Sequence, residues 1–280
     1  MYRILEKQSL NTQVTKMKIY APAVAKKAAP GQFVILRSHK DSERLPLTVA
    51  DYDRTEGSVT VIFQVVGAGT ERLNHLRVGD SLSDFVGPLG NATKLDGLKK
   101  VAVVGGGVGC AIAYPVAKAL FERGTEVHAI VGFRSRELVI LEEEFRAHSA
   151  KFLPVSDDGS WGEKGLVTDA LRTLIEDGES YDEVIAIGPL PMMKFVSLLT
   201  KKYNIPTVVS MNPIMIDGTG MCGGCRLTVG GEVKFACVDG PEFDGHLVDF
   251  DEAIARSSMY RPTERRAHED TCNLFGKEVE

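Results

Sequence analysis

Short alternating runs of hydrophobic and polar residues fill the first hundred positions of the chain. Four of them, Gln13 to Ile19, Phe33 to Arg37, Leu47 to Asp51 and Ser58 to Val65, each predict a strand, and glycine, proline and aspartate separate them. Short strands at this density, divided by turn residues, are typical of a small antiparallel barrel. We therefore expect residues 1–97 to form a β-barrel domain.

The pattern changes near residue 98, where continuous apolar runs begin to alternate with helix-length segments. Lys99 to Val104 predicts a buried strand, Ile112 to Arg123 an apolar helix and Val127 to Val131 a second strand. A later strand, Glu183 to Gly188, is again followed by a helical segment. Strands and helices in alternation predict an α/β domain with a parallel sheet over residues 98–207.

A glycine-rich turn, Gly105-Gly-Gly-Val-Gly109, joins the first of these strands to its helix. Strand, glycine turn and helix in this order let a diphosphate approach the backbone amides at a helix N-terminus. No acidic residue ends the second strand, where a partner for a ribose hydroxyl is expected. Arg134 stands there instead and can either bind a 2′-phosphate or remain solvated, so NAD and NADP both stay open. The candidate nucleotide-binding residues are Gly105, Gly106, Gly107, Gly109, Arg134, Gly188 and Met192.

Two segments of the barrel region, Arg44-Leu-Pro-Leu-Thr48 and Gly67-Ala-Gly-Thr70, have groups that can bind an anion. In the second segment the glycines open backbone amides, and the threonine adds a hydroxyl at an expected helix start. In the first segment the guanidinium can contact a phosphate. A tight loop beside a surface arginine explains the same residues equally well. The candidate anion-binding residues here are Arg44, Leu47, Thr48, Gly67, Gly69 and Thr70.

Three of the five cysteines fall within sixteen positions near the C-terminal end. Cys222 and Cys225 precede two short alternating runs that meet at Gly230-Gly231, a dipeptide suited to a two-residue hairpin turn. Such a turn returns Cys237 to a position opposite Gly224. The three thiolates are therefore expected to converge, within a small domain over residues 208–245.

Asp217 precedes this group at a spacing that carries chemical information. Asp-x4-Cys-x2-Cys has the ligand spacing of plant-type [2Fe–2S] proteins, with a carboxylate in place of the first thiolate. Tetrahedral zinc usually takes a further ligand from a second cysteine or histidine pair, and none lies nearby in the sequence. Structural zinc, a disulfide with one spare thiol, and a turn-capping role for Asp217 remain alternatives. The candidate metal ligands are Asp217, Cys222, Cys225 and Cys237.

The amino-acid composition mainly excludes classes of function. The 280 residues are 44% hydrophobic and 25% charged with a net charge of −5, which gives no basic surface for nucleic acid or an anionic membrane. No run of about twenty apolar residues is present to span a bilayer. Clustered cysteines without a secretion signal then suggest a cytoplasmic protein. The charged C-terminal arm, residues 246–280, carries enough apolar residues to suit contact with a partner subunit.

Barrel, nucleotide domain and cysteine domain, in this order, resemble the ferredoxin–NADP reductase superfamily. Within it the chain is similar to the electron-transfer subunits of dihydroorotate dehydrogenase B. Those subunits have a fourth cysteine where this chain has Asp217, and in that respect the chain is more similar to small subunits of flavin-based bifurcating NADH-dependent reduced ferredoxin:NADP oxidoreductases. The resemblance covers nearly the whole chain and rests on Arg44–Thr48, Gly67–Thr70, Gly105–Gly109, Asp157–Ser160, Gly188–Met193 and the cysteine group.

The resemblance implies three groups and a route for electrons. FAD would be held by the barrel segments, NAD(H) by the glycine turn and the residues after the later strand, and a [2Fe–2S] cluster by the cysteine group. Electrons would pass among them and on to a larger iron–sulfur flavoprotein subunit, and indirectly to ferredoxin, with no catalytic acid, base or nucleophile required. The alternatives are the dihydroorotate enzyme, a standalone ferredoxin reductase, and a zinc-stabilised module that senses nucleotide without redox chemistry.

Overall fold

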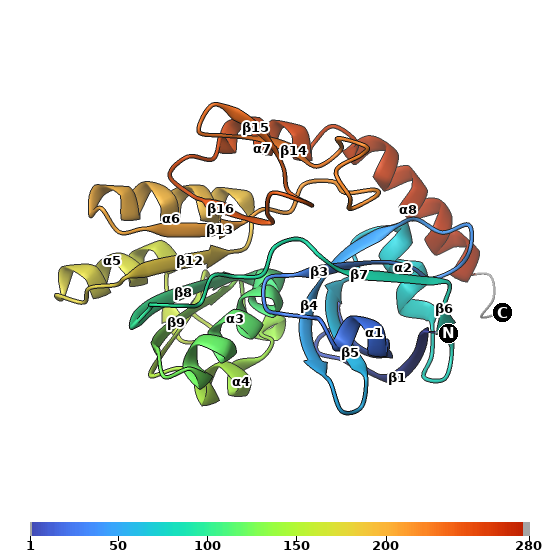
Figure 1. Cartoon of the computed structure of the whole chain (residues 1–280), viewed down its shortest axis with the longest axis horizontal. Coiled ribbons are helices and arrows are strands. Elements are labelled where there is room, and N and C mark those ends of the chain that lie inside the picture. Colours follow the sequence, from blue (N-terminus) through green and yellow to red (C-terminus); the bar gives the residue numbers. More distant parts are fainter. Residues whose placement is uncertain (1, 277–280) are drawn as a thin grey trace.

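The computed structural model describes residues 2–276, and two seven-stranded sheets form its framework (Figure 1). The first sheet has the order β6-β1-β2-β5-β4-β3-β7, and its strands pair antiparallel. Its two edge strands are consecutive in the chain, so the sheet curls into a nearly closed barrel, as predicted. Its strands are β1 (Tyr2–Ser9), β2 (Val14–Tyr20), β3 (Phe33–Arg37), β4 (Leu45–Asp53), β5 (Ser58–Gln64), β6 (Ser81–Leu82) and β7 (Asp84–Leu89), accompanied by helices α1 (Pro22–Ala25) and α2 (Ala68–His75).

The second sheet is parallel apart from one edge strand, which confirms the predicted α/β architecture. Its order is β11-β10-β9-β8-β12-β13-β16, and only β16 runs antiparallel to its neighbour. Its elements are β8 (Lys100–Gly106), α3 (Cys110–Glu122), β9 (Glu126–Phe133), α4 (Glu142–Ala147), β10 (Lys151–Ser156), β11 (Glu163–Lys164), α5 (Val167–Glu176), β12 (Glu183–Ile187), α6 (Leu190–Lys202), β13 (Thr207–Ser210) and β16 (Glu242–Asp244), with 3₁₀ turns at Gly107–Gly109 and Arg136–Leu138.

Helices cover both faces of this sheet, which explains the continuous apolar run of its central strand β8. Val101 and Val103 pack in one core with α3 and α4, whereas Ala102 and Val104 pack in another with α5 and α6. All four side chains are fully buried. A strand that is buried on both faces does not alternate between hydrophobic and polar residues, and the sequence of β8 is therefore hydrophobic throughout its buried part.

The cysteine segment forms the predicted hairpin of β14 (Arg226–Val229) and β15 (Glu232–Phe235). Gly230 and Gly231 both have positive φ, 60° and 81°, as a two-residue turn of the twisted hairpin type requires. Val229 pairs with Glu232, so the predicted register is confirmed. The chain then returns to the second sheet, where β16 pairs with β13.

Most of the described part of the C-terminal arm is helical. The arm includes helix α7 (Phe250–Ser257), capped by Asp249 Oδ1, which accepts the amide of Glu252 at 2.9 Å. The last helix, α8 (Arg261–Gly276), packs against α2 of the barrel (Figure 1). Residues 277–280 of the predicted arm lie outside the described residues. No helix in residues 2–276 combines the length and apolar character needed to cross a membrane.

Candidate functional site

The hairpin brings the second and third cysteines of the group together inside the protein. The backbone amide of Ala236 donates to the carbonyl of Cys225 at 3.1 Å, so the chain returns one residue before Cys237. Cys225 and Cys237 are 1% and 2% exposed. Burial, with the neighbouring Cys225 thiol adding to it, raises the pKa of Cys237 to about 12. Two thiols in such a place are unreactive alone, but a bound metal ion deprotonates its thiol ligands and holds them as thiolates.

Cys222 lies at the open side of the same group and is exposed. Its sulfur accepts the backbone amide of Gly224 at 3.4 Å, and the amide of Gly220 donates to the sulfur of Cys237. Amide bonds of this kind stabilise the negative charge of ligand sulfurs. The glycine-rich loop therefore supplies what an anionic iron–sulfur cluster needs.

The carboxylate of Asp217 organises the loop that leads to Cys222. Its Oδ1 accepts the amide of Thr219 at 2.7 Å, and its Oδ2 accepts the amides of Met221 at 3.1 Å and Cys222 at 3.0 Å. These bonds, that of Thr219 first, lower the pKa of Asp217, so the group is ionised at neutral pH. The structure thus shows the turn-capping role. The two amides occupy both lone pairs of Oδ2, and Oδ1 also accepts the Thr219 hydroxyl at 3.3 Å, so the predicted ligand role requires Asp217 to give up one of these bonds.

The four candidate ligands are not gathered as a single tetrahedral ion would need. Tetrahedral zinc, with Zn–S bonds of about 2.3 Å, needs sulfurs about 3.8 Å apart. Within the described part of the chain, Glu126, His128 and Glu179 alone offer three ligand atoms that all lie within 4.8 Å of one another. The Lys100 ammonium already pairs with both of those carboxylates, at 2.9 and 2.5 Å. No three of the four candidate cluster ligands bring their ligand atoms that close together in the described part of the chain.

A cavity of about 1180 Å³ opens at the carboxyl edge of the parallel sheet and collects most of the predicted nucleotide-binding residues. Gly105 is buried in β8 and does not line it. A Cβ on Gly109 would lie 2.6 Å from the Cα of Gly188, so only glycine permits this approach of α3 to the loop after β12. The predicted residues that line the cavity are Gly106, Gly107, Gly109, Arg134, Gly188 and Met192.

The same cavity contains an acidic residue that sequence reasoning did not assign to it. Asp157 follows β10, the neighbour of β9 in the sheet, and its amide donates to the carbonyl of Phe133 at 3.1 Å. Its exposed carboxylate therefore lies on the same cavity as Arg134. From the sequence, an acidic residue is expected only at the end of β9, and Asp157 is therefore missed. The loop after β10 reaches the cavity because β10 lies beside β9 in the sheet. The signal was the Asp157-Asp-Gly-Ser160 motif itself.

The two predicted anion-binding segments of the barrel lie next to each other at the start of α2. A Cβ on Gly69 would lie 2.5 Å from Glu43 Oε2 and 2.9 Å from Leu45 Cδ2, so the residues flanking Arg44 pack on the first turn of the helix. Leu47 and Thr48 follow in β4. The charged group that reaches the helix start is the Glu43 carboxylate, whereas the Arg44 guanidinium donates to the Asp217 carbonyl. The structure therefore brings the two predicted segments together, and the amides at the helix N-terminus are the groups there that are suited to a diphosphate.

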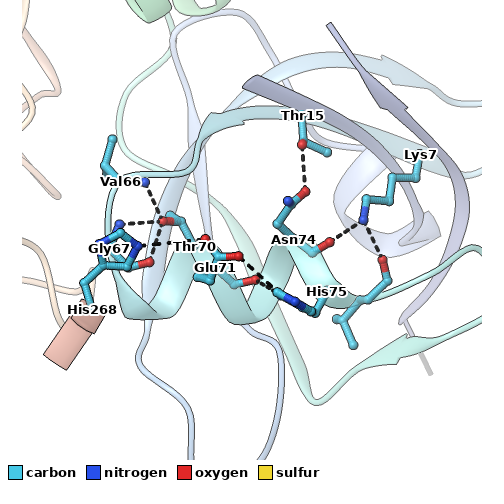
Figure 2. A network of polar contacts seen from close by, with 10 residues as sticks. Lys7, Thr15, Val66, Gly67, Thr70, Glu71, Asn74, His75 and His268 are labelled. Atoms are coloured by element: carbon cyan, nitrogen blue, oxygen red, sulfur yellow. Dashed lines mark hydrogen bonds and ion pairs between the residues drawn. The ribbon is translucent and has the colours of Figure 1, made fainter. Parts of the chain in front are cut away.

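The Thr70 hydroxyl has a different role in the structure from the one expected. Its oxygen accepts the amides of Val66 at 3.0 Å and Gly67 at 3.1 Å and donates to the carbonyl of Gly67 (Figure 2). It therefore closes the turn that precedes α2, and the amides of the helix itself remain for an anion. From α8, His268 Nε2 lies 3.9 Å from Glu71 Oε2, which places the C-terminal helix over this turn (Figure 2).

Comparisons with known proteins also assign the cysteine group and the nucleotide cavity to separate domains. A family model for the iron–sulfur cluster binding domain of dihydroorotate dehydrogenase B matches residues 212–249, and one for the oxidoreductase NAD-binding domain matches residues 103–198. The dihydroorotate dehydrogenase B (NAD(+)) electron transfer subunit homolog of Thermotoga maritima is 46% identical over 274 residues, covering 98% of this chain and 96% of that protein. The chain belongs to the family of dihydroorotate dehydrogenase B electron-transfer subunits.

Two further relatives define the place of the chain in this family. The electron transfer subunit from Geobacillus thermodenitrificans is 32% identical over 249 residues, 86% of this chain and 94% of that one. A solved structure of an NADH-dependent reduced ferredoxin–NADP oxidoreductase, described for its flavin-based electron bifurcation, is 44% identical with a TM-score of 0.91. It covers 96% of this chain, and 97% of its own chain is matched. The chain is thus a member of an oxidoreductase family with iron–sulfur, flavin and NAD-binding parts.

Substitution of Asp217 separates its two roles. If the carboxylate is a ligand, Asp217→Cys restores the four-cysteine set, and the protein should keep two irons per chain with a changed electron paramagnetic resonance (EPR) spectrum. Asp217→Ala should lose most of its iron, because the cluster loses a ligand and three exposed backbone amides lose their acceptor, at about 0.5–1.5 kcal/mol for each hydrogen bond. Iron analysis and EPR of the dithionite-reduced proteins measure both effects. An Asp217→Cys protein without iron would show that the carboxylate only caps the turn.

Proposed function

We propose that the chain is the electron-transfer subunit of a flavin-based bifurcating NADH-dependent reduced ferredoxin:NADP oxidoreductase. It would pass electrons between NAD(H), FAD and a [2Fe–2S] cluster and on to a larger iron–sulfur flavoprotein subunit. The observation that carries the proposal is the match over nearly the full length of both chains to the solved bifurcating enzyme. Asp217 at the first ligand position supports it, because the resemblance associates that residue with the bifurcating enzymes.

The second candidate is the electron-transfer subunit of NAD-dependent dihydroorotate dehydrogenase. The matching cluster-domain family and the named relatives of Thermotoga and Geobacillus favour it. The two candidates share all three groups on this chain and differ in the partner. The experiment that separates them is purification of the chain from its native host with whatever binds to it. A larger iron–sulfur flavoprotein supports the bifurcating enzyme, and a partner that oxidises dihydroorotate contradicts it.

The cavity explains how a nucleotide can reach the barrel. Besides the glycine turn, its walls include Asn11, Gln13 and Gln64, which belong to the barrel domain. One end of the cavity is therefore at the diphosphate-binding turn of the α/β domain and another is at the barrel. A dinucleotide bound by the turn can extend toward the FAD site, as hydride transfer between two ring systems requires.

The chemistry belongs to the bound groups, and the chain supplies their positions. When bound, NADH gives a hydride, FAD takes up electron pairs and releases electrons singly, and the cluster accepts one electron at a time. The amides of the glycine turn would hold the NAD(H) diphosphate, and the start of α2 with Arg44 would hold that of FAD. Cys222, Cys225, Cys237 and Asp217 would hold the irons. None of these residues needs to donate or accept a proton.

The face around the exposed cysteine fits the proposed partner subunit. Ile216, Met221 and Val238 are 54%, 87% and 43% exposed and lie on the loops that surround Cys222. Apolar side chains gathered on a surface mark a protein interaction site. Docking there would bring the partner's own electron acceptor close to the cluster. Ferredoxin would then take part only through that subunit.

The free cysteines are consistent with a cytoplasmic location. Cys110, Cys222, Cys225 and Cys237, the cysteines whose side chains the structure describes, form no disulfide. Buried unpaired thiols and an iron–sulfur cluster both persist best where the medium is reducing. We therefore place the protein in the cytoplasm.

Asp157 should determine which nucleotide this subunit uses. A carboxylate near the ribose can accept a hydrogen bond from the 2′-hydroxyl of NAD(H) and repels a 2′-phosphate by about 1–4 kcal/mol at about 4 Å. Asp157→Asn should therefore raise kcat/KM for NADPH relative to NADH by about tenfold. Flavin reduction by the two nucleotides, followed by stopped-flow absorbance, measures the ratio.

Asp158→Asn is the matched control for this substitution. Asp158 is also exposed, but its Oδ1 accepts the amide of Ser160 at 2.9 Å and the residue does not line the cavity. Its ratio of NADPH to NADH use should stay at the wild-type value. A ratio that is equally unaffected in Asp157→Asn would show that this carboxylate does not face the ribose.

A further inference from the structure

The segment Glu43–Leu45 lies between the predicted FAD site and the cysteine group. On one side, Glu43 and Leu45 pack on the first turn of α2, within 2.5 and 2.9 Å of where a Cβ of Gly69 would be. On the other side, Arg44 Nη2 donates to the backbone carbonyl of Asp217 at 3.4 Å. Residues that are 173 positions apart in the sequence thus meet at the join between barrel and cluster loop.

The cluster loop rests on the barrel at the next residue as well. Gly218 has φ +78°, and a Cβ there would lie 2.6 Å from Ile35 Cδ1 and 2.9 Å from Leu89 Cδ1. Both the left-handed conformation and the close approach to β3 and β7 need a residue without a side chain. The loop therefore packs directly on apolar side chains of two barrel strands at Gly218. Arg44 holds the backbone of the preceding residue, Asp217.

Asp217 connects the contact between Gly218 and the barrel to the sulfur ligands. Its carboxylate accepts the amides of Met221 and Cys222, so the position of its backbone sets that of the first cysteine. Direct contacts then run from the first turn of α2, through the segment Glu43–Leu45, to the backbone beside Cys222.

We propose that Arg44 is a positioning residue for the cluster: it ties the loop that begins at Asp217 to the FAD-binding part of the barrel. This role is separate from any contact of the guanidinium with the FAD diphosphate, and it rests on the proposed function. It keeps the two electron-carrying sites at a fixed separation. It also means that one arginine serves both sites.

The test uses the rate at which iron leaves the protein, a quantity that does not depend on turnover. In Arg44→Ala, iron release to a chelator under anaerobic conditions should be about two- to tenfold faster, the factor that corresponds to one lost hydrogen bond. The EPR spectrum of the reduced cluster should change in the same protein. Arg44→Lys should recover part of the wild-type rate, because an ammonium can also donate to the Asp217 carbonyl.

Arg54→Ala is the matched control. Arg54 is also exposed and also donates to a backbone carbonyl, that of Ala28 at 3.0 Å, but both groups belong to the barrel alone. Its iron release and EPR spectrum should match the wild type. All proteins are measured with FAD in excess, so that a change in FAD content does not alter the comparison.

Three results bear on the proposal. Faster iron release in Arg44→Ala, with a normal rate in Arg54→Ala, supports it. An Arg44→Ala protein that binds FAD weakly but has wild-type iron release and EPR overturns it, since Arg44 then serves FAD alone. Wild-type protein that holds no iron contradicts the proposed function itself, which distinguishes that failure from a failure of the Arg44 proposal.

Discussion

Cys237→Ser is expected to remove nearly all iron from the protein while FAD remains bound. Cys237 is buried beside Cys225 and completes the sulfur set only because the β14–β15 hairpin returns it there. A serine hydroxyl is a much poorer ligand for iron than a thiolate, because iron–sulfur clusters select soft sulfur ligands. The absorbance of the cluster and its EPR signal should both disappear, and the flavin spectrum should be unchanged.

Cys110→Ala is the control for that result. Cys110 is also fully buried, at the start of α3, but it belongs to the core on the other side of the parallel sheet. Burial raises the pKa of its thiol well above the ordinary value, so it behaves as a small apolar side chain. Its replacement should leave the iron content at the wild-type level. Equal iron content in Cys237→Ser and Cys110→Ala would exclude Cys237 as a ligand.

Gly109→Ala should weaken NADH binding by at least tenfold. The added Cβ would lie 2.6 Å from both the Cα of Gly188 and the carbonyl oxygen of Ile187, and backbone atoms cannot move aside as a flexible side chain can. The start of α3 would shift away from β12, at a cost of about 1–3 kcal/mol, and the amides of the glycine turn would lose their alignment. Titration of the flavin absorbance with NADH measures the dissociation constant.

Iron content and EPR show whether the Gly109→Ala protein is folded, because the cluster lies in a different part of the chain. Ala119→Val is the matched control, since it also adds carbon atoms to α3 but at a position away from the cavity. It should bind NADH as the wild type does. Normal binding in both variants would mean that the dinucleotide does not use this turn.

Local patterns were sufficient to predict most of the framework. The hairpin register followed from Gly230-Gly231, because a two-residue turn fixes which residues pair. The buried strand β8 and its glycine turn were equally clear, because an apolar run followed by closely spaced glycines has few other structural solutions. Both features depend on residues that are adjacent in the sequence.

Features that depend on distant residues were not predictable from the sequence. Asp157 joins the nucleotide cavity because β10 lies beside β9, and strand order is a property of the whole sheet. The packing of α8 on α2 has little hydrophobic signature, since α8 is highly charged and a buried residue in it is a threonine, Thr271. The bond from Arg44 to Asp217 joins two loops from different domains. Tertiary packing determines each of these contacts.

Asp217 is a single residue for which one sequence pattern predicts two different roles. Its spacing from Cys222 indicates a ligand, and its hydrogen bonds in the structure show a cap, and both follow from a carboxylate placed before a glycine-rich loop. The sequence pattern is the same for the two roles.

The most direct test of the account is the metal content of the chain purified without exposure to air, determined together with acid-labile sulfide and the EPR spectrum after reduction. The account predicts two irons and two sulfides per chain, and a signal from one unpaired electron that is lost in Cys237→Ser. One zinc per chain, with no iron and no signal, would contradict it.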